Sequence, residues 1–274
     1  MIKHYLKVAF RNLMKYKTQS LVSIIGLAVG FTCFALSALW IRYEMTYDNF
    51  HEGAERIYLV RAHYANEPGT SKFTPYPLMK YLQDKMPEIE AVTAFTAHHV
   101  KFRMEDTEQE IGMIAADSVF MNFFDIQLLK GTVNFLKCDG QEVAITKEFA
   151  KRLFSKEEDA LGKEVEVGRR VCKIGAIVSG WSNHSNIPYN ILAPARHSPR
   201  WGSSNEQLFI RVRERTDIDA FRTKMSTVCI NDIEKESELS DLLITRMSAL
   251  RYSDYVDKAD VVISFSYIFY LFIS

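Results

Sequence analysis

The chain has 274 residues, of which 47% are hydrophobic and 25% charged, so it carries enough apolar material for a folded core. Its formal net charge of zero is unevenly distributed. Residues 1–20 carry five basic side chains and no acidic one, whereas the rest, with the other 29 Lys and Arg and all 34 Asp and Glu, is net −5. Positive charge confined to one end argues against nucleic-acid binding.

Residues 2–17 have apolar side chains at three- and four-residue spacing, beginning with Ile2 and Leu6, and a separate basic stripe. This pattern predicts a basic amphipathic helix that lies on an anionic membrane surface, within a cytoplasmic segment over residues 1–20. The surface-binding side chains would be Lys3, Lys7, Arg11, Lys15 and Lys17. The alternative is a solvated positive flank that only sets the topology.

Residues 21–41 contain no Asp, Glu, Lys, Arg or His. A helix rises about 1.5 Å per residue, so this segment is long enough to cross a hydrocarbon layer of about 30 Å. The positive-inside rule places the N-terminus in the cytoplasm and the chain from Arg42 onward outside. A buried core helix and a cleaved signal peptide are the alternatives. The apolar run is long for a signal peptide, and bulky residues such as Trp40 follow it, which favours an uncleaved anchor.

Within the expected span, Gly26 and Gly30 form a GxxxG pattern. Small residues allow helix backbones to approach closely, so this face is a candidate surface for packing against another transmembrane helix. Glycine is also common in membrane helices without such a role.

The region from 42 to 260 is expected to lie outside the membrane, after the helix ends between Asn49 and Gly53. Residues 57–64 and 92–104 have strand patterns. Between them we expect a helix capped by Thr74, with Pro75 in its first turn. Residues 208–212, a capping box at 216–219, a helix and residues 242–247 repeat this order. The sequence thus predicts an α+β fold with two βαβ-like halves.

A strand-rich insertion is expected between the two halves. We predict a strand at 109–115, a short helix capped by Asp117, a strand leading into a helix capped by Thr146, and a hairpin over 165–178. Near the end, residues 261–273 are again apolar and uncharged but give only about 20 Å of helix. We interpret them as the start of a second transmembrane helix, cut off partway, after which more protein would follow.

Recognisable catalytic chemistry is missing from the sequence. Neither GxSxG nor a phosphate-binding glycine loop occurs. The adjacent His98 and His99 would point to opposite faces of a strand, which prevents simple chelation. We therefore expect no catalytic residue, cofactor or metal. The four cysteines have no metal-ligand spacing and are interpreted as small hydrophobic residues; they are Cys33, Cys138, Cys172 and Cys229.

Five stretches together, in order, resemble the MacB/FtsX-type permeases of bacterial ABC transporters, and the N-terminal portion looks most like the large permeases of Bacteroidetes-type bacteria. They are MIKHYLKVAFRNLMKYKTQSLVSIIGLAVG, YDNFHEGAERIYLV, TPYPLMKYLQDKMPEIEAV, ADSVFMNFFDIQLLKG and VAITKEFAKRLFSKEEDALGKEV.

This resemblance implies a periplasmic domain between two spans in the bacterial inner membrane. Its porter-like part would cover about 54–108 and 206–250, with an inserted Sabre-like subdomain at about 109–205. The implied partners are a separate cytoplasmic ABC ATPase, a second permease copy or homologue, and a periplasmic partner or lipid or peptide cargo. ATP hydrolysis by the partner would drive export, lipoprotein extraction or mechanotransmission. An extracytoplasmic sensor domain of a membrane receptor or kinase is the alternative function.

Overall fold

The computed structural model describes residues 2–65, 68–105, 107–137, 141–154, 156–181, 184–237 and 239–250. The chain divides into two compact units, one formed by residues 1–46 and the other by the residues from 47 onward. The expected second transmembrane segment, residues 261–273, lies outside the described residues.

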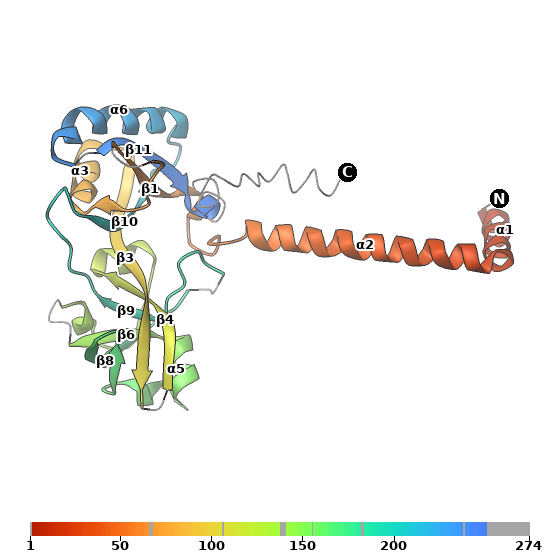
Figure 1. The fold of residues 1–274 in the computed structure, drawn as a ribbon, viewed down its shortest axis with the longest axis horizontal. Helices are drawn as coiled ribbons and strands as arrows, with labels where there is room; N and C mark the ends of the chain where they lie inside the picture. Colours follow the sequence, from red (N-terminus) through yellow and green to blue (C-terminus); the bar gives the residue numbers. More distant parts are fainter. Residues whose placement is uncertain are drawn as a thin grey trace. The chain divides into compact units, whose positions relative to one another are not determined.

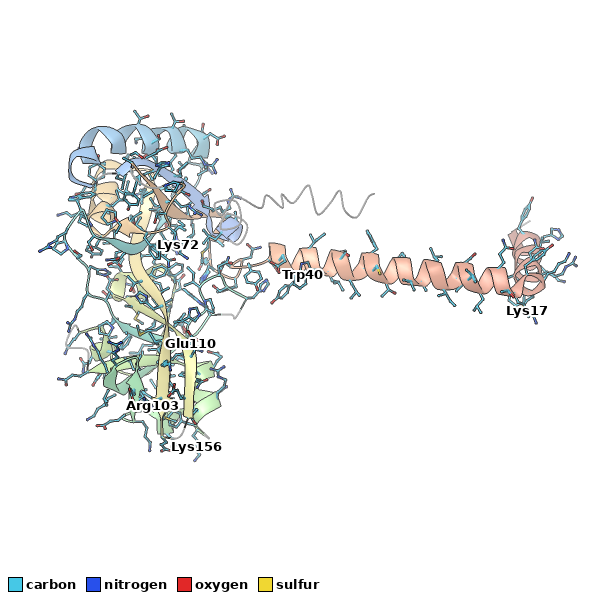
Figure 2. All side chains as sticks on the ribbon, in the orientation of Figure 1. Lys17, Trp40, Lys72, Arg103, Glu110 and Lys156 are labelled. Atoms are coloured by element: carbon cyan, nitrogen blue, oxygen red, sulfur yellow. The ribbon has the colours of Figure 1, made fainter. Side chains whose placement is uncertain are left out.

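Two helices make up the first unit: α1 (Ile2–Lys15) and α2 (Lys17–Met45), which are separated at Tyr16. The stretch Lys17–Glu44 contains an 18-residue window with a mean hydropathy of 2.2 and no buried residue, and it is long and apolar enough to cross a membrane. Figure 2 shows Lys17 and Trp40 toward opposite ends of α2. The predicted span, 21–41, lies inside this helix.

Helix α2 ends earlier than the sequence predicted. Its last residue is Met45, and the hydroxyl of Thr46 donates back to the carbonyls of Arg42 and Tyr43, 3.1 and 3.0 Å away. Three residues beyond the helix, Asp48 has a φ of 57°, in the left-handed region that cannot continue a right-handed helix. The predicted end between Asn49 and Gly53 is therefore wrong.

The second unit contains one 11-stranded sheet, whose main order is β11-β1-β10-β3-β4-β9-β6-β8-β5, with β2 on β10 and β7 on β3 and β8. The first part of this path consists of β1 (Ile57–Tyr64), β3 (Ile89–Met104), β10 (Ser204–Val212) and β11 (Leu239–Arg246). Helix α3 (Pro77–Lys85) connects β1 to β3, and α6 (Ile218–Ser237) connects β10 to β11.

These elements confirm the two βαβ-like halves and show that they interleave. β10 pairs antiparallel with both β1 and β3, and β1 pairs antiparallel with both β10 and β11. Each half therefore has its two parallel strands separated by one strand of the other half, the split βαβ arrangement. Neither half has a complete sheet without its counterpart.

The inserted strands continue the same sheet. They are β4 (Thr107–Ala116), β5 (Leu128–Gly131), β6 (Glu142–Thr146), β7 (Glu164–Val167), β8 (Arg170–Val178) and β9 (Ile191–Pro194). The helical elements among them are α4 (Ser118–Phe123), η2 (Val133–Leu136), α5 (Lys147–Leu153) and η3 (Glu157–Ala160). The predicted caps are confirmed, since Asp117 accepts from Phe120 N and Thr146 accepts from Phe149 N.

Strand β3 joins the two regions of the sheet. Residues from Ile89 to Phe95 pair with β10, and residues from Thr96 to Met104 pair with β4. Figure 1 shows this long strand running from the region that α3 and α6 cover into the region beside α5. One continuous backbone therefore belongs to both parts of the domain.

Three apolar clusters fill the unit. Alternate residues of β1 and β10 pack against α3 and α6 on one face, as Tyr58 and Leu208 do, and against α4 on the other, as Leu59 and Phe209 do. The third cluster lies among the inserted strands and α5, around Phe102. The two short remaining 3-10 helices are η1 (Ala54–Arg56) and η4 (Met247–Ala249).

Two predicted caps are wrong. Thr74 does not cap a helix; it begins β2 (Thr74–Pro75), where it is buried, pairs with Glu206 in β10 and donates its hydroxyl to the Glu206 carbonyl. Helix α3 starts instead at Pro77, because proline suits the first helical position. At α6 the cap is Asp217, whose carboxylate accepts from Asp219 N and Ala220 N, whereas the Thr216 hydroxyl donates to Arg213 O.

Candidate functional site

The basic side chains predicted to bind a membrane surface lie at the N-terminal end of the chain. Lys7, Arg11 and Lys15 are exposed and follow one another at four-residue spacing on α1, which places them along one side of that helix. Lys17 is the exposed first residue of α2. Lys3 falls within α1, but its side chain lies outside the described part of the structure.

Gly26 and Gly30 lie one turn apart on α2, and a Cβ added at either position would meet nothing within 4 Å. The surface of α2 is therefore open at these two positions. The first unit alone supplies no partner for it among its described residues.

The segment that follows α2 is anchored at Asp48, which is fully buried. Its backbone N donates to the carbonyl of His184, 3.2 Å away. Its carboxylate accepts from Ser185 Oγ at 2.5 Å, from Asn186 N at 3.2 Å and from Asn186 Nδ2 at 2.6 Å. We call residues 47–51 the junction segment and residues 184–187 the clamp loop.

The full burial of Asp48 is unusual for an ionisable side chain. Burial raises the pKa of its carboxyl group above the ordinary value of 3.8, although the hydrogen bonds from Ser185 and Asn186 lower it. A carboxylate is an acceptor-only group when ionised, and the three donors around it satisfy both of its oxygens. The desolvation cost of this residue is thus offset by a set of donors on a loop that lies 136 or more positions away in the sequence.

The junction segment also makes aromatic contacts on both sides of Asp48 in the sequence. Tyr47 lies against the His184 ring, with centroids 3.9 Å apart. The imidazole of His51 contacts Trp181 and Phe124, with centroid separations of 4.9 and 5.1 Å. Burial, aided by the charge of Arg211, lowers the pKa of His51 to about 4, so this ring is neutral at physiological pH.

A second polar cluster lies where β2 and β10 meet the start of α4. His197 stacks on Tyr76, its Nδ1 lies 3.2 Å from Glu206 Oε1, and its Nε2 lies 3.9 Å from Asp117 Oδ2. The side chain of Glu206 is only 6% exposed and that of His197 12%. The imidazole thus lies between a carboxylate of β10 and the carboxylate that caps α4.

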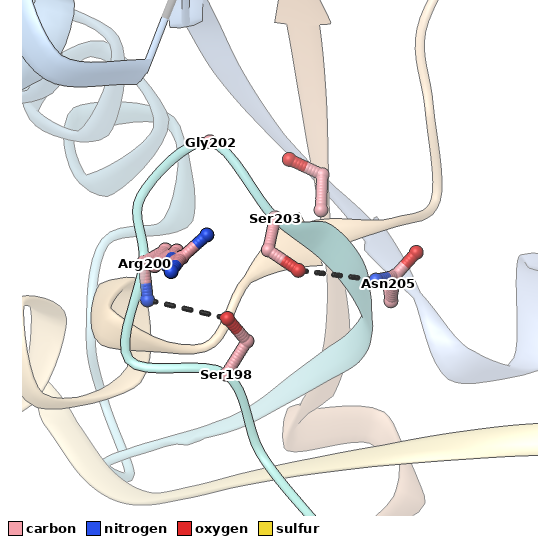
Figure 3. A pocket seen from close by; sticks show the side chains of 6 residues that line it. Ser198, Arg200, Gly202, Ser203 and Asn205 are labelled. Carbon is pink, nitrogen blue, oxygen red and sulfur yellow. Dashed lines mark hydrogen bonds between the residues drawn. The ribbon is translucent and has the colours of Figure 1, made fainter.

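An open hollow of about 570 Å³ lies beside the start of β10. Figure 3 shows Ser203 accepting from the amide of Asn205, and Ser198 accepting from the backbone N of Arg200. Its lining is made of Ser198, Arg200, Gly202, Ser203, Ser204 and Asn205. These six residues include no His, Cys, Asp or Glu, so they supply no general base to activate a hydroxyl.

No group of three or more His, Cys, Asp or Glu that could hold a metal ion occurs within the described residues. Of the cysteines that the structure describes, Cys33 and Cys172 form no disulfide, and Cys172 is buried as expected for a small hydrophobic residue. Cys138 and the side chain of Cys229 lie outside what the structure describes.

The sequence singled out neither Asp48 nor its partners in the clamp loop. The contact joins residues 137 and 138 positions apart, which no local pattern reveals. Two features of the sequence could have drawn attention to this contact. They are the polar stretch around Asn186 between two strands and the position of Asp48 soon after an apolar helix.

A helix of spanning length followed by a large α+β unit is the arrangement of a membrane protein with an extracytoplasmic domain. The chain belongs to the MacB-like periplasmic core domain family, which matches residues 20–228. It is accordingly a MacB-like component of an ABC-type permease. No curated protein matches the sequence.

Solved structures share the fold at low sequence identity. A domain of a putative permease from Porphyromonas gingivalis is 20% identical, with a TM-score of 0.58 over 72% of this chain and 92% of that one. The extracellular domain of the noncanonic ABC-type transporter YknZ from Gram-positive bacteria is 14% identical, with a TM-score of 0.51 over 69% and 99%. The periplasmic region of MacB from Actinobacillus actinomycetemcomitans is 12% identical, with a TM-score of 0.51 over 74% and 94%.

Proposed function

We propose that this chain is the permease subunit of a MacB/FtsX-type ABC transporter, and that it couples ATP hydrolysis by a separate ATPase to a conformational change outside the membrane. The observation that carries the proposal is the family match, which runs from the start of α2 through most of the outer domain. Export, lipoprotein extraction and mechanotransmission are three outputs of the same coupling.

The proposed orientation places α1 in the cytoplasm and the second unit in the periplasm of a bacterial inner membrane. The basic side chains of residues 1–20, with no acidic residue among them, support this topology. Lys7, Arg11 and Lys15 would lie at the anionic inner surface, near the ATPase.

The proposed assembly contains two permease copies and a cytoplasmic ATPase. The open face at Gly26 and Gly30 supports a role for α2 in packing against another transmembrane helix. Within the outer domain, we propose a porter-like part at about 54–108 and 206–250 and an inserted part at about 109–205. Two observations support this division: the two halves interleave in one part of the sheet, and the inserted strands join that sheet along the second part of β3.

The test is coexpression of the full-length protein with the ABC ATPase encoded beside it, followed by affinity purification and measurement of ATP hydrolysis in lipid nanodiscs. We expect copurification and a rate of hydrolysis that changes when the permease is present. An ATPase carrying a substitution in its own catalytic glutamate is the control for background hydrolysis. The proposal would be contradicted if the two proteins did not copurify and the rate of ATP hydrolysis did not change.

A further inference from the structure

The chain between the membrane helix and the first fixed point of the outer domain is very short. Helix α2 ends at Met45, and Asp48 is already fully buried and hydrogen-bonded through its backbone N. Two residues separate them, and the second, Tyr47, already lies against the His184 ring. A two-residue link reaches at most about 11 Å between the flanking Cα atoms, so it has little slack to absorb a displacement of the helix.

Asp48 is bound to the clamp loop by its side chain and connected to β1 only through the chain. Three donors of Ser185 and Asn186 converge on its carboxylate, and two of these contacts are 2.6 Å or shorter. Hydrogen bonds to an ionised group are shorter and about twice as strong as neutral ones. The route along the chain to β1 passes instead through Gly53 and the short helix η1.

Hydrogen bonds stabilise the turn of the clamp loop and connect it to the chain that follows β8. Ile187 N donates to Ser185 Oγ, and Trp181 Nε1 donates to Ile187 O, 3.1 and 2.9 Å away. The Tyr189 hydroxyl reaches back to the carbonyl of Ser179, 3.1 Å away. The loop connects β8 to β9, and β9 lies between β4 and β6 in the sheet. A displacement of the loop therefore moves the middle of the inserted region.

We infer that Asp48 is the positioning residue that transmits movement of the membrane helix to the clamp loop and so to the inserted strands β8 and β9. This inference rests on the proposed function, because it requires that α2 moves when ATP is hydrolysed. Movement of α2 would reach two parts of the domain through Asp48. One is β1, through the covalent chain, and the other is the clamp loop, through hydrogen bonds that begin 136 residues further along the chain.

The test variant is Asp48→Gly, because glycine adopts the left-handed conformation at no steric cost and removes only the carboxylate. The matched control is Asp125→Gly. Asp125 has a φ of 52°, close to the 57° of Asp48, but its side chain is exposed. Both changes thus alter a left-handed aspartate, and only one removes the contacts with Ser185 and Asn186.

The measurement is hydrogen–deuterium exchange of the full-length permease with its ATPase in nanodiscs, with and without ATP. In the wild type we expect ATP to change exchange both in residues 57–64 and in residues 184–194. Asp48→Gly should keep the first change and reduce the second at least threefold, whereas Asp125→Gly should behave as the wild type. Exchange of residues 57–64 and 208–212 without ATP reports whether each variant is folded.

A double variant tests whether Asp48 acts through its contact with Asn186 or only stabilises the fold. The pair Asp48→Asn and Asn186→Asp exchanges donor and acceptor across the same contact, so together they should restore part of the response at 184–194 that Asp48→Asn alone loses. Asparagine also tolerates the left-handed conformation, so Asp48→Asn serves as the test variant if Asp48→Gly does not fold.

A full ATP response at 184–194 in the folded Asp48 variants overturns the inference but leaves the proposed function intact. No ATP response anywhere in the wild-type outer domain overturns the proposed function, and the inference with it.

Discussion

The imidazole of His197 stacks on the ring of Tyr76, with 4.0 Å between their centroids and 4° between their planes. This stacking holds the imidazole Nδ1 3.2 Å from the Oε1 atom of the buried Glu206. The arrangement is tertiary, since Tyr76 precedes α3 and Glu206 belongs to β10.

Replacing His197 with Ala should destabilise the outer domain by about 2 kcal/mol, because the buried Glu206 would lose the imidazole that lies beside its Oε1 atom. Chemical unfolding of the full chain in detergent, followed by tryptophan fluorescence, measures this change. In the double variant with Glu206→Gln the loss should be smaller than the sum of the two single losses, by about 0.5 kcal/mol or more. Strict additivity would show that the two side chains are not coupled.

His51 should make the outer domain sensitive to acid. Its folded-state pKa of about 4 lies below the ordinary value of 6.5, so the unfolded chain binds the proton more readily. The stabilisation from the neutral ring is complete above pH 6.5 and is lost as the pH falls toward 4, by roughly 3 kcal/mol. The free energy of unfolding at pH 7 and pH 4, compared between wild type and His51→Phe, tests this.

The phenylalanine variant is expected to keep the ring contacts with Trp181 and Phe124 while removing the titration. It should therefore lose about 3 kcal/mol less than the wild type between the two pH values. An equal loss in both proteins would assign the acid sensitivity to other groups.

Gly112 should not accept a side chain. A Cβ at this position would lie 2.4 Å from the carbonyl oxygen of Pro188, a backbone atom that cannot turn aside. We expect Gly112→Ala to cost about 2 kcal/mol. Gly202→Ala is the matched control, since a Cβ there meets nothing within 4 Å and the expected change is close to zero. Thermal unfolding of both variants measures the difference, and equal midpoints would refute the predicted clash.

The glycine face of α2 should be required for assembly. Gly26→Leu and Gly30→Leu add bulk to this open face and should lower copurification of a second permease copy or uncouple ATP hydrolysis. Ala28→Leu, on the opposite side of the same helix, adds similar bulk without touching this face. Size-exclusion chromatography of tagged and untagged copies in nanodiscs compares the assembly of the three variants. Normal assembly and coupling in the glycine variants would leave α2 as a simple anchor.

Local signals predicted much of the fold. The strand at 57–64, the caps Asp117 and Thr146 and the hairpin at 165–178 depend on residues close together in the sequence, and the structure confirms each. The length and apolar character of α2 were readable for the same reason.

What the sequence could not show depends on distant partners. Thr74 has the local pattern of a helix cap, but pairing with Glu206 makes it a strand residue, and tertiary contacts outweigh propensity. The end of α2 was misplaced because the left-handed turn at Asp48 is held by the clamp loop. The interleaving of the two halves follows from which strands pair across long sequence distances, which the isolated segments do not encode.

The shared strand β3 limits how this domain can be engineered. Excising residues 109–205 would remove the partners of β3 from Thr96 to Phe102 and leave that part of the strand with unpaired N–H and C=O groups. Such an edge is a template for intermolecular pairing, so the truncated protein would tend to aggregate. The inserted region occupies one continuous stretch of sequence, yet it cannot be exchanged between relatives as an independent module unless the second half of β3 travels with it.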